Sequence, residues 1–298
     1  MSDTLASLRR KIGGAGDLES VVRSMKALAA ASIGQYEKSV LALTDYYRTV
    51  ELGLAVCLRK RKEGAAEQNG GPDAAATMVH AIVFGSDQGL VGQFNDLLAG
   101  FVAKALDALP GEKKVWAVGE RIHARLADAG LAPVGLFAVP TSVGAITPLV
   151  GQILVEHEAH HDQSRNIQLD LFHNHPKSGA AYEPVSQRLL PLDEQWRLKL
   201  AHLPWPTKNL PEVIGDREPT LAALVREYLF VSLYKACAES LASENASRLA
   251  AMQRAEKNID ELTENLNRTF RRLRQTSIDE ELFDVLSGYE SLSKEPTR

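Results

Sequence analysis

One segment, from Glu218 to about Ser287, constrains the fold more than any other. It contains no glycine and, after Pro219 in its first turn, no proline. Apolar residues recur along it at steps of three and four, which is typical of the seam of a coiled coil. One helix of that length would measure about 100 Å, far beyond the usual helix of roughly 8–20 residues. Such a helix cannot bury its apolar stripe alone, so it needs a partner helix. The expected stripe runs through Leu221, Leu224, Tyr228, Val231, Tyr234, Ala238, Leu241, Asn245, Leu249, Met252, Ile259, Leu262, Leu266, Phe270 and Leu273.

The candidate partner helix lies at the amino end of the chain, in residues 5–58. This segment also lacks proline and carries apolar residues at helical spacing. Three glycines near its start each cost roughly 1 kcal/mol relative to alanine in a helix interior. We therefore expect the two terminal helices to pair as an antiparallel coiled coil, with positions near Met25 facing positions near Leu266. The three glycines are Gly13, Gly14 and Gly16.

The middle of the chain has the pattern of an α/β domain. Short apolar runs that end at glycine or proline alternate with amphipathic stretches, which predicts a parallel or mixed sheet with a Rossmann-like arrangement. Expected strands are 78–84, 114–118, 136–139, 167–173 and an edge strand at 188–192, and expected helices are 94–109, 121–129 and 147–160.

These elements predict four parts of the chain. Residues 1–60 form the first coiled-coil helix, 61–77 a linker rich in Gly, Ala and Asn, 78–208 the globular α/β domain, and 209–298 the second coiled-coil helix. The fold class is therefore α/β, with a long antiparallel coiled coil and a central Rossmann-like domain.

Composition excludes several classes of protein. The net charge of −4 and the pI near 6.1 argue against general nucleic-acid binding. Two cysteines, Cys57 and Cys237, have no metal-binding spacing and indicate a reduced compartment. The chain has no run of eighteen apolar residues, and we expect no membrane span, secretory signal or transit peptide.

A glycine-rich turn, Gly85 to Asn95, follows the first expected strand. Backbone amides of such a turn can bind a phosphate at a helix N-terminus. The spacing, however, is neither the dinucleotide fingerprint nor a Walker loop, and no lysine follows it. We therefore expect a tight turn capped by Asp87 or Asn95, with no cofactor bound.

Histidines gather in the polar segment that ends the 147–160 helix and in the strand after it. His157 and His161 are four residues apart on one helix face and have the spacing of transition-metal ligands. The polarity of the segment instead favours a solvated helix end, so no metal site is expected. The other members of this group are Glu156, Glu158, His160, His173 and His175.

Basic residues gather near the two ends of the chain. In an antiparallel pair they would lie around one end of the coil and create a local positive field suited to an acidic protein surface or phosphate. The alternative is an ordinary solvated coil face. The residues are Arg268, Arg271, Arg272 and Arg274 on the second helix, and Arg9, Arg10, Lys11, Arg23 and Lys26 on the first.

Three separated motifs resemble the gamma subunit of F-type ATP synthases. The segment Ser243–Met252, followed by Arg274-Gln275-Thr-Ser-Ile-Asp-Glu-Glu-Leu282, is similar to that family's S-E-x-x-x-R-M-x-A-M and R-Q-x-x-I-x-x-E-L. Arg9-Arg10-Lys11-Ile12 and Met25-Lys26 resemble its amino-terminal helix. The turn matches its S-D-R-G-L-C-G-x-x-N at Ser86, Asp87, Gly89, Leu90, Gly92 and Asn95, with Gln88 in place of Arg and Val91 in place of Cys.

The resemblance implies a function as the central shaft of a rotary ATP synthase. It implies a non-catalytic subunit with no cofactor, which contacts the alpha and beta subunits, the epsilon subunit and the membrane c-ring. It places the chain at the cytoplasmic side of a bacterial inner membrane. Residues implied to contact beta subunits and transmit torque are Arg274, Gln275, Arg271, Arg268, Arg248, Met25 and Lys26.

Three alternatives stay open at this point. One is a gamma subunit of a sodium-translocating variant of the synthase. The second, of a different class, is an enzyme or nucleotide-binding α/β protein on a coiled-coil scaffold, which would use the turn at 85–95. The third is a coiled-coil scaffold that only dimerises.

Overall fold

The computed structural model describes residues 4–59, 78–160, 167–177, 181–192, 196, 198, 200, 202–209 and 211–293. The expected linker, Lys62 to Thr77, lies outside these residues, and the proposed division into four parts stays a prediction. The chain separates into two compact units, one made of Met1–Leu28 with Ala250–Arg298 and the other of Ala29–Leu249. The elements, in order, are α1 (Leu5–Arg59), β1 (Met78–Phe84), α2 (Phe94–Asp107), β2 (Glu112–Val118), α3 (Glu120–Asp128), β3 (Gly135–Phe137), α4 (Ile146–Ala159), β4 (Ile167–Pro176), β5 (Tyr182–Leu190) and α6 (Arg217–Ser293).

The two long helices agree with the sequence pattern. α6 has 77 residues and α1 has 55. α1 is continuous through Gly13, Gly14 and Gly16, because the cost of three glycines is small beside the burial along the rest of the helix. None of the described helices is long and apolar enough to cross a membrane.

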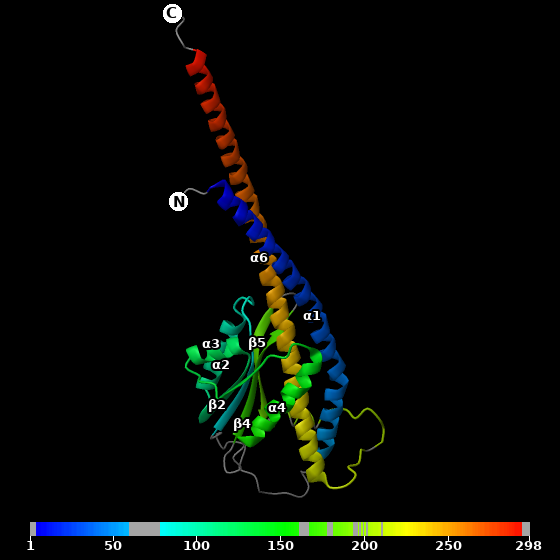
Figure 1. The fold of residues 1–298 in the computed structure, drawn as a ribbon. Helices are drawn as coiled ribbons and strands as arrows, with labels where there is room; N and C mark the ends of the chain where they lie inside the picture. The colour runs from blue at the N-terminus through cyan, green and yellow to red at the C-terminus, as the bar shows by residue number, and fades with distance from the viewer. Residues whose placement is uncertain are drawn as a thin grey trace, which may run out of the picture. The chain divides into compact units, whose positions relative to one another are not determined.

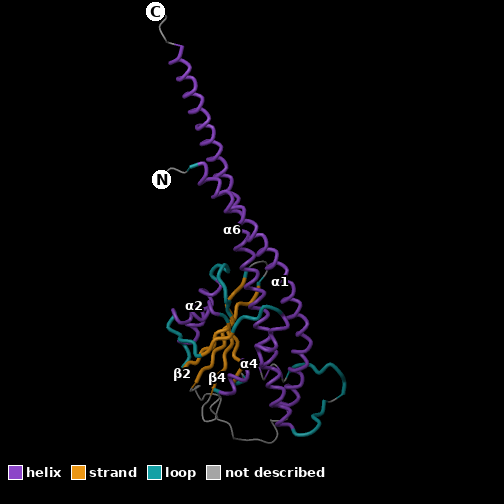
Figure 2. The backbone as a smooth tube through the Cα atoms, viewed as in Figure 1, coloured by secondary structure: helices purple, strands orange, loops and turns teal. Residues whose placement is uncertain are grey.

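The central sheet has five strands in the order β3-β2-β1-β4-β5. In Figure 2 the strands are orange, and β2 and β4 are labelled. The strands β3, β2, β1 and β4 run parallel to one another, and β5 pairs antiparallel with β4 at the edge. The expectation of a parallel or mixed sheet is thus confirmed as a mixed one. Pro191, which cannot donate to a strand ladder, follows the end of this edge strand.

Helices cover both faces of the sheet in the second unit (Figure 1). On one face, α2 and α3 pack through Leu98, Val102 and Ile122 against Val79 and Ala81 of β1. On the other face, the core is built from β1, β4, α4, α1 and α6. Its fully buried members include Leu54, Ile82, Phe84, Leu169, Leu171, Ile146, Val150, Tyr228 and Leu233.

The long helices run antiparallel in the first unit. The Arg9 guanidinium lies over the Phe270 ring, 5.9 Å from its centroid, and Lys26 Nζ lies 2.5 Å from Glu256 Oε2. As residue numbers rise along α1, the numbers of the residues that face them on α6 therefore fall. This register corrects the expectation that positions near Met25 face Leu266, because Leu266 lies ten residues, or about 15 Å, beyond Glu256.

The same direction holds in the second unit. The Tyr46 hydroxyl donates to Glu227 Oε2 at 2.7 Å, and seven residues later a Cβ at Gly53 would lie 3.0 Å from Leu224 Cδ2. The predicted antiparallel pairing of the terminal helices is therefore confirmed within each unit.

One member of the expected seam is wrong. Leu262 is 50% exposed, whereas Thr263 is partly buried and its Oγ1 is enclosed with no hydrogen-bond partner among the residues that the structure describes. The step from Ile259 to the next seam position is four residues, and only the packed partner helix decides between three and four.

Candidate functional site

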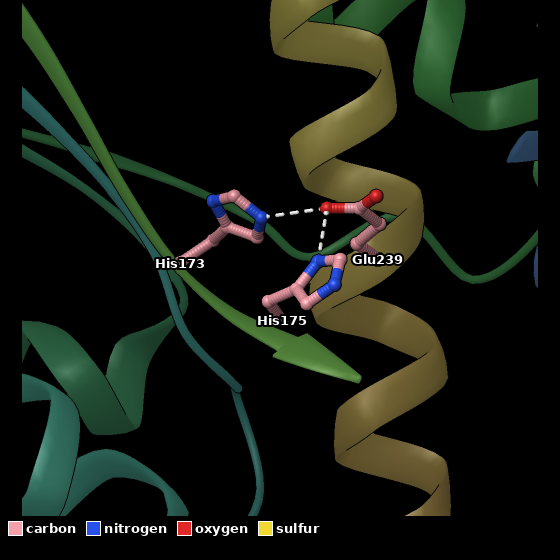
Figure 3. A group of neighbouring side chains, drawn as sticks. All are labelled: His173, His175 and Glu239. Atoms are coloured by element: carbon pink, nitrogen blue, oxygen red, sulfur yellow. Dashed lines mark hydrogen bonds and ion pairs between the residues drawn. The ribbon is translucent and has the colours of Figure 1, made fainter. Parts of the chain in front are cut away.

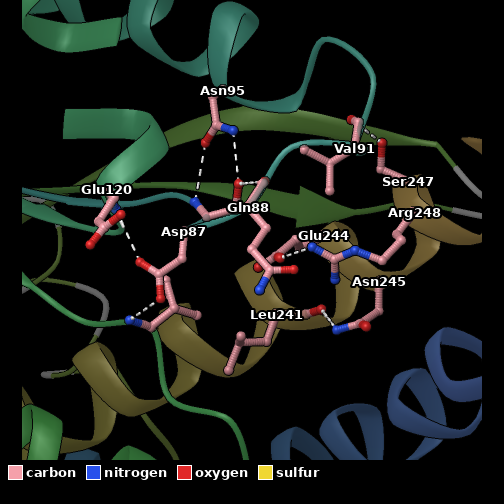
Figure 4. A network of polar contacts seen from close by, with 12 residues as sticks. Asp87, Gln88, Val91, Asn95, Glu120, Leu241, Glu244, Asn245, Ser247 and Arg248 are labelled. Carbon is pink, nitrogen blue, oxygen red and sulfur yellow. Dashed lines mark hydrogen bonds and ion pairs between the residues drawn. The ribbon is translucent and has the colours of Figure 1, made fainter. Parts of the chain in front are cut away.

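The turn after β1 is closed by two side chains. Asn95 Oδ1 accepts a hydrogen bond from the Ser86 amide at 3.1 Å, and Asn95 Nδ2 donates to Ser86 Oγ at 2.8 Å (Figure 4). Both residues are buried, whereas Gly89 and Leu90 are exposed. Gly92 and Leu90 take left-handed backbone conformations, with φ of 60° and 63°. The side chain of Asn95 thus hydrogen-bonds to both the amide and the hydroxyl of Ser86.

Asp87 ties this turn to two other segments. Its Oδ1 accepts from the amide of Glu120, in the first turn of α3, at 3.0 Å, and its Oδ2 accepts from the amide of Val139 at 3.1 Å. The turn is tight as predicted, but the expected cap is wrong: α2 has no side-chain cap from Asp87 or Asn95, and Asp87 instead accepts from the first amide of α3. A carboxylate beside the turn also disfavours a bound phosphate.

Three serines on one face of α6 bond it to the carboxyl ends of β1 and β4 and to the turn after β1. Ser240 Oγ donates to the Phe84 carbonyl at 3.0 Å, Ser243 Oγ to the Asn174 carbonyl at 2.9 Å, and Ser247 Oγ to the Val91 carbonyl at 2.6 Å. This edge is where open α/β sheets usually bind ligands. Here the long helix covers it, so the turn serves as the seat of α6.

Arg248, one of the residues implied to contact a beta subunit, is held inside the chain. Its Nη2 lies 2.6 Å from Glu244 Oε1, and the two side chains are 15% and 7% exposed. Burial raises the pKa of Glu244; the charge of Asp87 adds to this, and Arg248 opposes it. Arg248 therefore compensates a buried carboxylate.

Lys26 also has a partner within the chain, the Glu256 carboxylate, and Arg23 Nε lies 4.0 Å from the same side chain. Met25, next to them, is partly buried. The expected gathering of basic residues around one end of the coil thus applies to Arg9, beside Phe270. It does not apply to Arg23 and Lys26, because their partner Glu256 lies 14 residues before Phe270 on α6.

The remaining basic residues near the end of α6 form the outward-facing cluster that the sequence predicts. Arg271, Arg274 and Gln275 are exposed, while Leu273 between them is partly buried. Arg268 is exposed as well and donates to Glu264 Oε1 at 3.0 Å. This geometry leaves three polar side chains directed at solvent on a rigid helix.

An apolar surface that the sequence reasoning missed follows this cluster. Arg9 contacts Phe270 and α1 begins at Leu5, so among the described residues α6 has no α1 residue opposite it beyond about Arg274. Large exposed apolar patches mark surfaces for protein partners. The signal was visible as an apolar pattern continuing past the end of the partner helix. The exposed residues are Ile278, Leu282, Phe283, Val285, Leu286 and Tyr289, each at least 50% exposed.

The surroundings of the histidines differ from the solvated helix end that the sequence predicts. His157 is buried, with its Nδ1 3.0 Å from Nδ1 of His80 on β1. His161 lies outside the described residues. His173 and His175 are on β4, where both contact Glu239 of α6, a residue that the sequence did not connect with them. His173 and His175 lie 66 and 64 residues before Glu239, so the local sequence gives no signal of these contacts.

Comparison with known proteins agrees with this arrangement. A family model described as ATP synthase matches residues 4–292. The chain is 26% identical to the ATP synthase gamma chain of a Nitratiruptor species, over 97% of this chain and 99% of that one. It is also 26% identical to the gamma chain of Salinibacter ruber, over 97% and 98%.

Solved structures share the fold. A chain of the Euglena gracilis mitochondrial ATP synthase, from the OSCP/F1/c-ring structure in rotational state 3, has a TM-score of 0.62 at 16% identity, covering 99% of this chain and 97% of that one. A chain of the rotor of the same synthase has a TM-score of 0.60 at 15% identity, covering 92% and 98%. Matched across residues 4–292, the chain belongs to the ATP synthase family.

Proposed function

We propose that this chain is the gamma subunit, the central rotor shaft that couples ion flow through a membrane c-ring to ATP synthesis or hydrolysis in the alpha/beta hexamer. The observation that carries the proposal is the carboxyl end of α6, which extends beyond α1 as a helix with exposed apolar residues from Ile278 to Tyr289. Membership of the ATP synthase family and similarity to gamma chains along its length support it.

The subunit acts mechanically and carries out no chemistry itself. Its described loop at β1 uses Ser86, Asp87 and Asn95 for internal hydrogen bonds, and α6 covers the strand ends where a ligand would bind. The shaft works by contacting one conformation of a beta subunit better than another, because only differential contact can shift an equilibrium between conformations. Rotation then presents the same contacts to each beta subunit in turn.

Four residues are the best candidates for these contacts. Arg271, Arg274 and Gln275 are exposed next to the apolar end of α6, and Arg268 is exposed with only a solvent-facing partner. Charge-assisted hydrogen bonds from arginine to carboxylates are stronger than neutral ones and fix geometry.

The other three candidates make contacts within the chain itself. Lys26 and Arg248 are ion-paired within the chain, and Met25 is partly buried. Their contribution to torque would be indirect, through the stiffness of the helix pair and the attachment of α6 to the globular domain. Contact with a beta subunit would require the two ion pairs to open.

The remaining partners follow from the same role. The globular α/β domain would contact the epsilon subunit and the c-ring, and the subunit would be a peripheral protein at the cytoplasmic side of a bacterial inner membrane. A shaft of a sodium-translocating synthase would have the same architecture, because ion selectivity belongs to the c-ring. The nucleotide-binding alternative is disfavoured by the internally bonded turn.

The proposed function is tested by asking whether the chain assembles with alpha and beta subunits. The full chain, co-expressed with the alpha and beta subunits of its own organism, should purify with them in a fixed stoichiometry and support MgATP hydrolysis. The chain alone should give no calorimetric signal with MgATP. A chain that fails to join the hexamer would contradict the proposal, and micromolar ATP binding, about −8 kcal/mol, would revive the nucleotide-binding alternative.

A further inference from the structure

The end of β4 presents two imidazoles to α6. His173 and His175 are two residues apart on one strand, and side chains at that spacing lie on the same face of a sheet. Glu239 of α6 lies opposite them (Figure 3). His173 Nε2 is 2.8 Å and His175 Nδ1 is 3.0 Å from the same carboxylate oxygen, Oε2.

These three ligand atoms have nearly the spacing of a metal site. They all lie within 4.8 Å of one another. In a tetrahedral site with bonds of roughly 2.0–2.2 Å, neighbouring ligand atoms are about 3.4 Å apart. Each imidazole nitrogen therefore needs to move about 0.5 Å away from Glu239, and the two imidazole nitrogens, which lie within 4.8 Å of each other, need to converge to about 3.4 Å. Side-chain rotation can supply both movements.

Burial and charge suit a cation with one open ligand position. The side chains of His173 and Glu239 are 6% and 8% exposed, whereas that of His175 is 44% exposed, which leaves one side open to water. Glu239 is the acidic member of the group, and its Oε2 faces both imidazoles.

One nearby cation must be considered. Lys235 Nζ lies 3.8 Å from Oε1 of Glu239, the oxygen that does not contact the histidines. The lysine side chain is 49% exposed on a flexible stem. It can therefore remain in solvent while Oε2 binds an ion.

The strand between the histidines is fixed on both sides. Asn174 Nδ2 donates to the Phe94 carbonyl at 3.1 Å, and Ser243 Oγ donates to the Asn174 carbonyl at 2.9 Å. Ser243 is one turn of α6 beyond Glu239. The ligands thus come from two elements whose separation is already set, which lowers the cost of organising a site.

We propose that His173, His175 and Glu239 bind one divalent transition-metal ion, with Zn²⁺ as the preferred metal and water as the fourth ligand. Two imidazoles and one carboxylate suit Zn²⁺ better than Ca²⁺ or Mg²⁺, which prefer oxygen ligands. The ion would join β4 to α6 and hold the helix on its seat. This inference does not rest on the proposed shaft function.

The affinity is expected to be moderate. When each imidazole binds metal, its N–H proton resides on the other ring nitrogen. For His173 that nitrogen is Nδ1, which is buried without a hydrogen-bond partner among the described residues. Loss of such an outer partner typically costs 10–100-fold in affinity. We expect a dissociation constant of about 1 μM, weaker than the nanomolar values of sites whose ligands have their outer hydrogen-bond partners.

The experiment is calorimetric titration of the metal-stripped full chain with ZnCl₂. The expected result is one equivalent bound, with binding at least about tenfold weaker in His175→Gln and in Glu239→Gln. His202→Gln, at an exposed histidine far from Glu239 in sequence, is the matched control and should bind normally. Saturation of the unmodified chain at about 100 times the dissociation constant should raise Tm by about 5 °C.

Two outcomes would overturn the proposal. One is the absence of saturable binding to the unmodified chain. The other is unchanged binding in His175→Gln, which would locate the ion at other histidines, such as His80 and His157. His175→Gln decides the matter even if Glu239→Gln fails to fold, because His175 is partly exposed and far-ultraviolet circular dichroism can verify that this variant is folded.

Discussion

Arg248 compensates the buried carboxylate of Glu244 one turn before it on α6. Their 2.6 Å ion pair is almost closed to solvent, and Oε2 of Glu244 has no hydrogen-bond partner among the described residues. Removing one partner of a buried pair leaves an uncompensated charge and typically costs 3–5 kcal/mol. Arg248 is therefore a structural residue of the globular domain before it is a contact for any other subunit.

Arg248→Met should lower the free energy of unfolding by about 3 kcal/mol at neutral pH. The pKa of Glu244 is already raised, so the folded state holds its proton more tightly than the unfolded state does. Stability of the variant should recover as pH falls toward the ordinary glutamate pKa, and fall as pH rises through the raised value. Urea denaturation across pH measures this.

The control is the double variant Glu244→Gln with Arg248→Met. It removes both charges, so its loss at neutral pH should be much smaller and nearly independent of pH in that window. A large and pH-independent loss in Arg248→Met alone would show that packing of the arginine stem, and not its charge, matters.

The register of the helix pair can be measured by cross-linking. Cysteines at Lys26 and Glu256, joined by a short bismaleimide, should link in high yield because the native side chains meet. Cysteines at Lys26 and Leu266 should link poorly, since they are about 15 Å apart along the helix. Native Cys57 and Cys237 are both buried, and burial raises the pKa of each, so they should react little. Equal yields for the two pairs would contradict the register.

Thr263→Val should stabilise the helix pair by about 1 kcal/mol. The Thr263 hydroxyl is enclosed on the seam and has no hydrogen-bond partner within the described part of the chain, and such a group costs roughly 1–3 kcal/mol. Thr276→Val is the control, because its hydroxyl donates to the Arg272 carbonyl and is exposed, so its effect should stay within about 0.5 kcal/mol. Thermal denaturation followed by circular dichroism at 222 nm compares the two.

Alanine at Gly13, Gly14 or Gly16 should stabilise α1 by about 0.5–1 kcal/mol each. A Cβ at each position would meet no atom of the described residues within 4 Å, apart from its chain neighbours and the helix's own backbone. Gly85→Ala should do the opposite, because its Cβ would collide with Ile122 beneath the turn. If alanine at the three helix positions destabilises the chain, the helix needs those glycines for a reason other than packing within this chain.

Replacing both Arg274 and Gln275 by leucine should leave the coiled coil folded and lower ATP turnover of the assembled complex. Both side chains point away from the seam and are exposed, so the expected loss is that of charged contacts to another subunit, roughly 1.5–3 kcal/mol if one contact dominates. Steady-state hydrolysis and ion pumping by the reconstituted complex measure it.

Lys257→Leu with Asn258→Leu is the matched control on the same helix. These are also an exposed base followed by an exposed amide, and Lys257 has only a weak solvent-facing ion pair to Glu261. If the Arg274 and Gln275 double variant turns over and pumps like the control, the shaft acts on the hexamer by shape.

The sequence alone determined the elements and their order. The spacing of apolar residues requires long helices at both ends, and the apolar runs at 78–84 and 167–173 require buried strands. These signals are local, since helix and strand periods are set by neighbouring residues. The glycine-rich turn at 85–95 was also readable from its local composition, but the pairing of Ser86 with Asn95 was not predicted.

Only the tertiary structure decided which distant residues meet. Lys26 faces Glu256 because the packing of two helices fixes one register among several with similar apolar matches. Thr263 and not Leu262 lies on the seam for the same reason. The meeting of His173 and His175 with Glu239, across more than sixty residues, depends on where α6 packs on the sheet. Long-range contacts of this kind follow from packing, which no local period encodes.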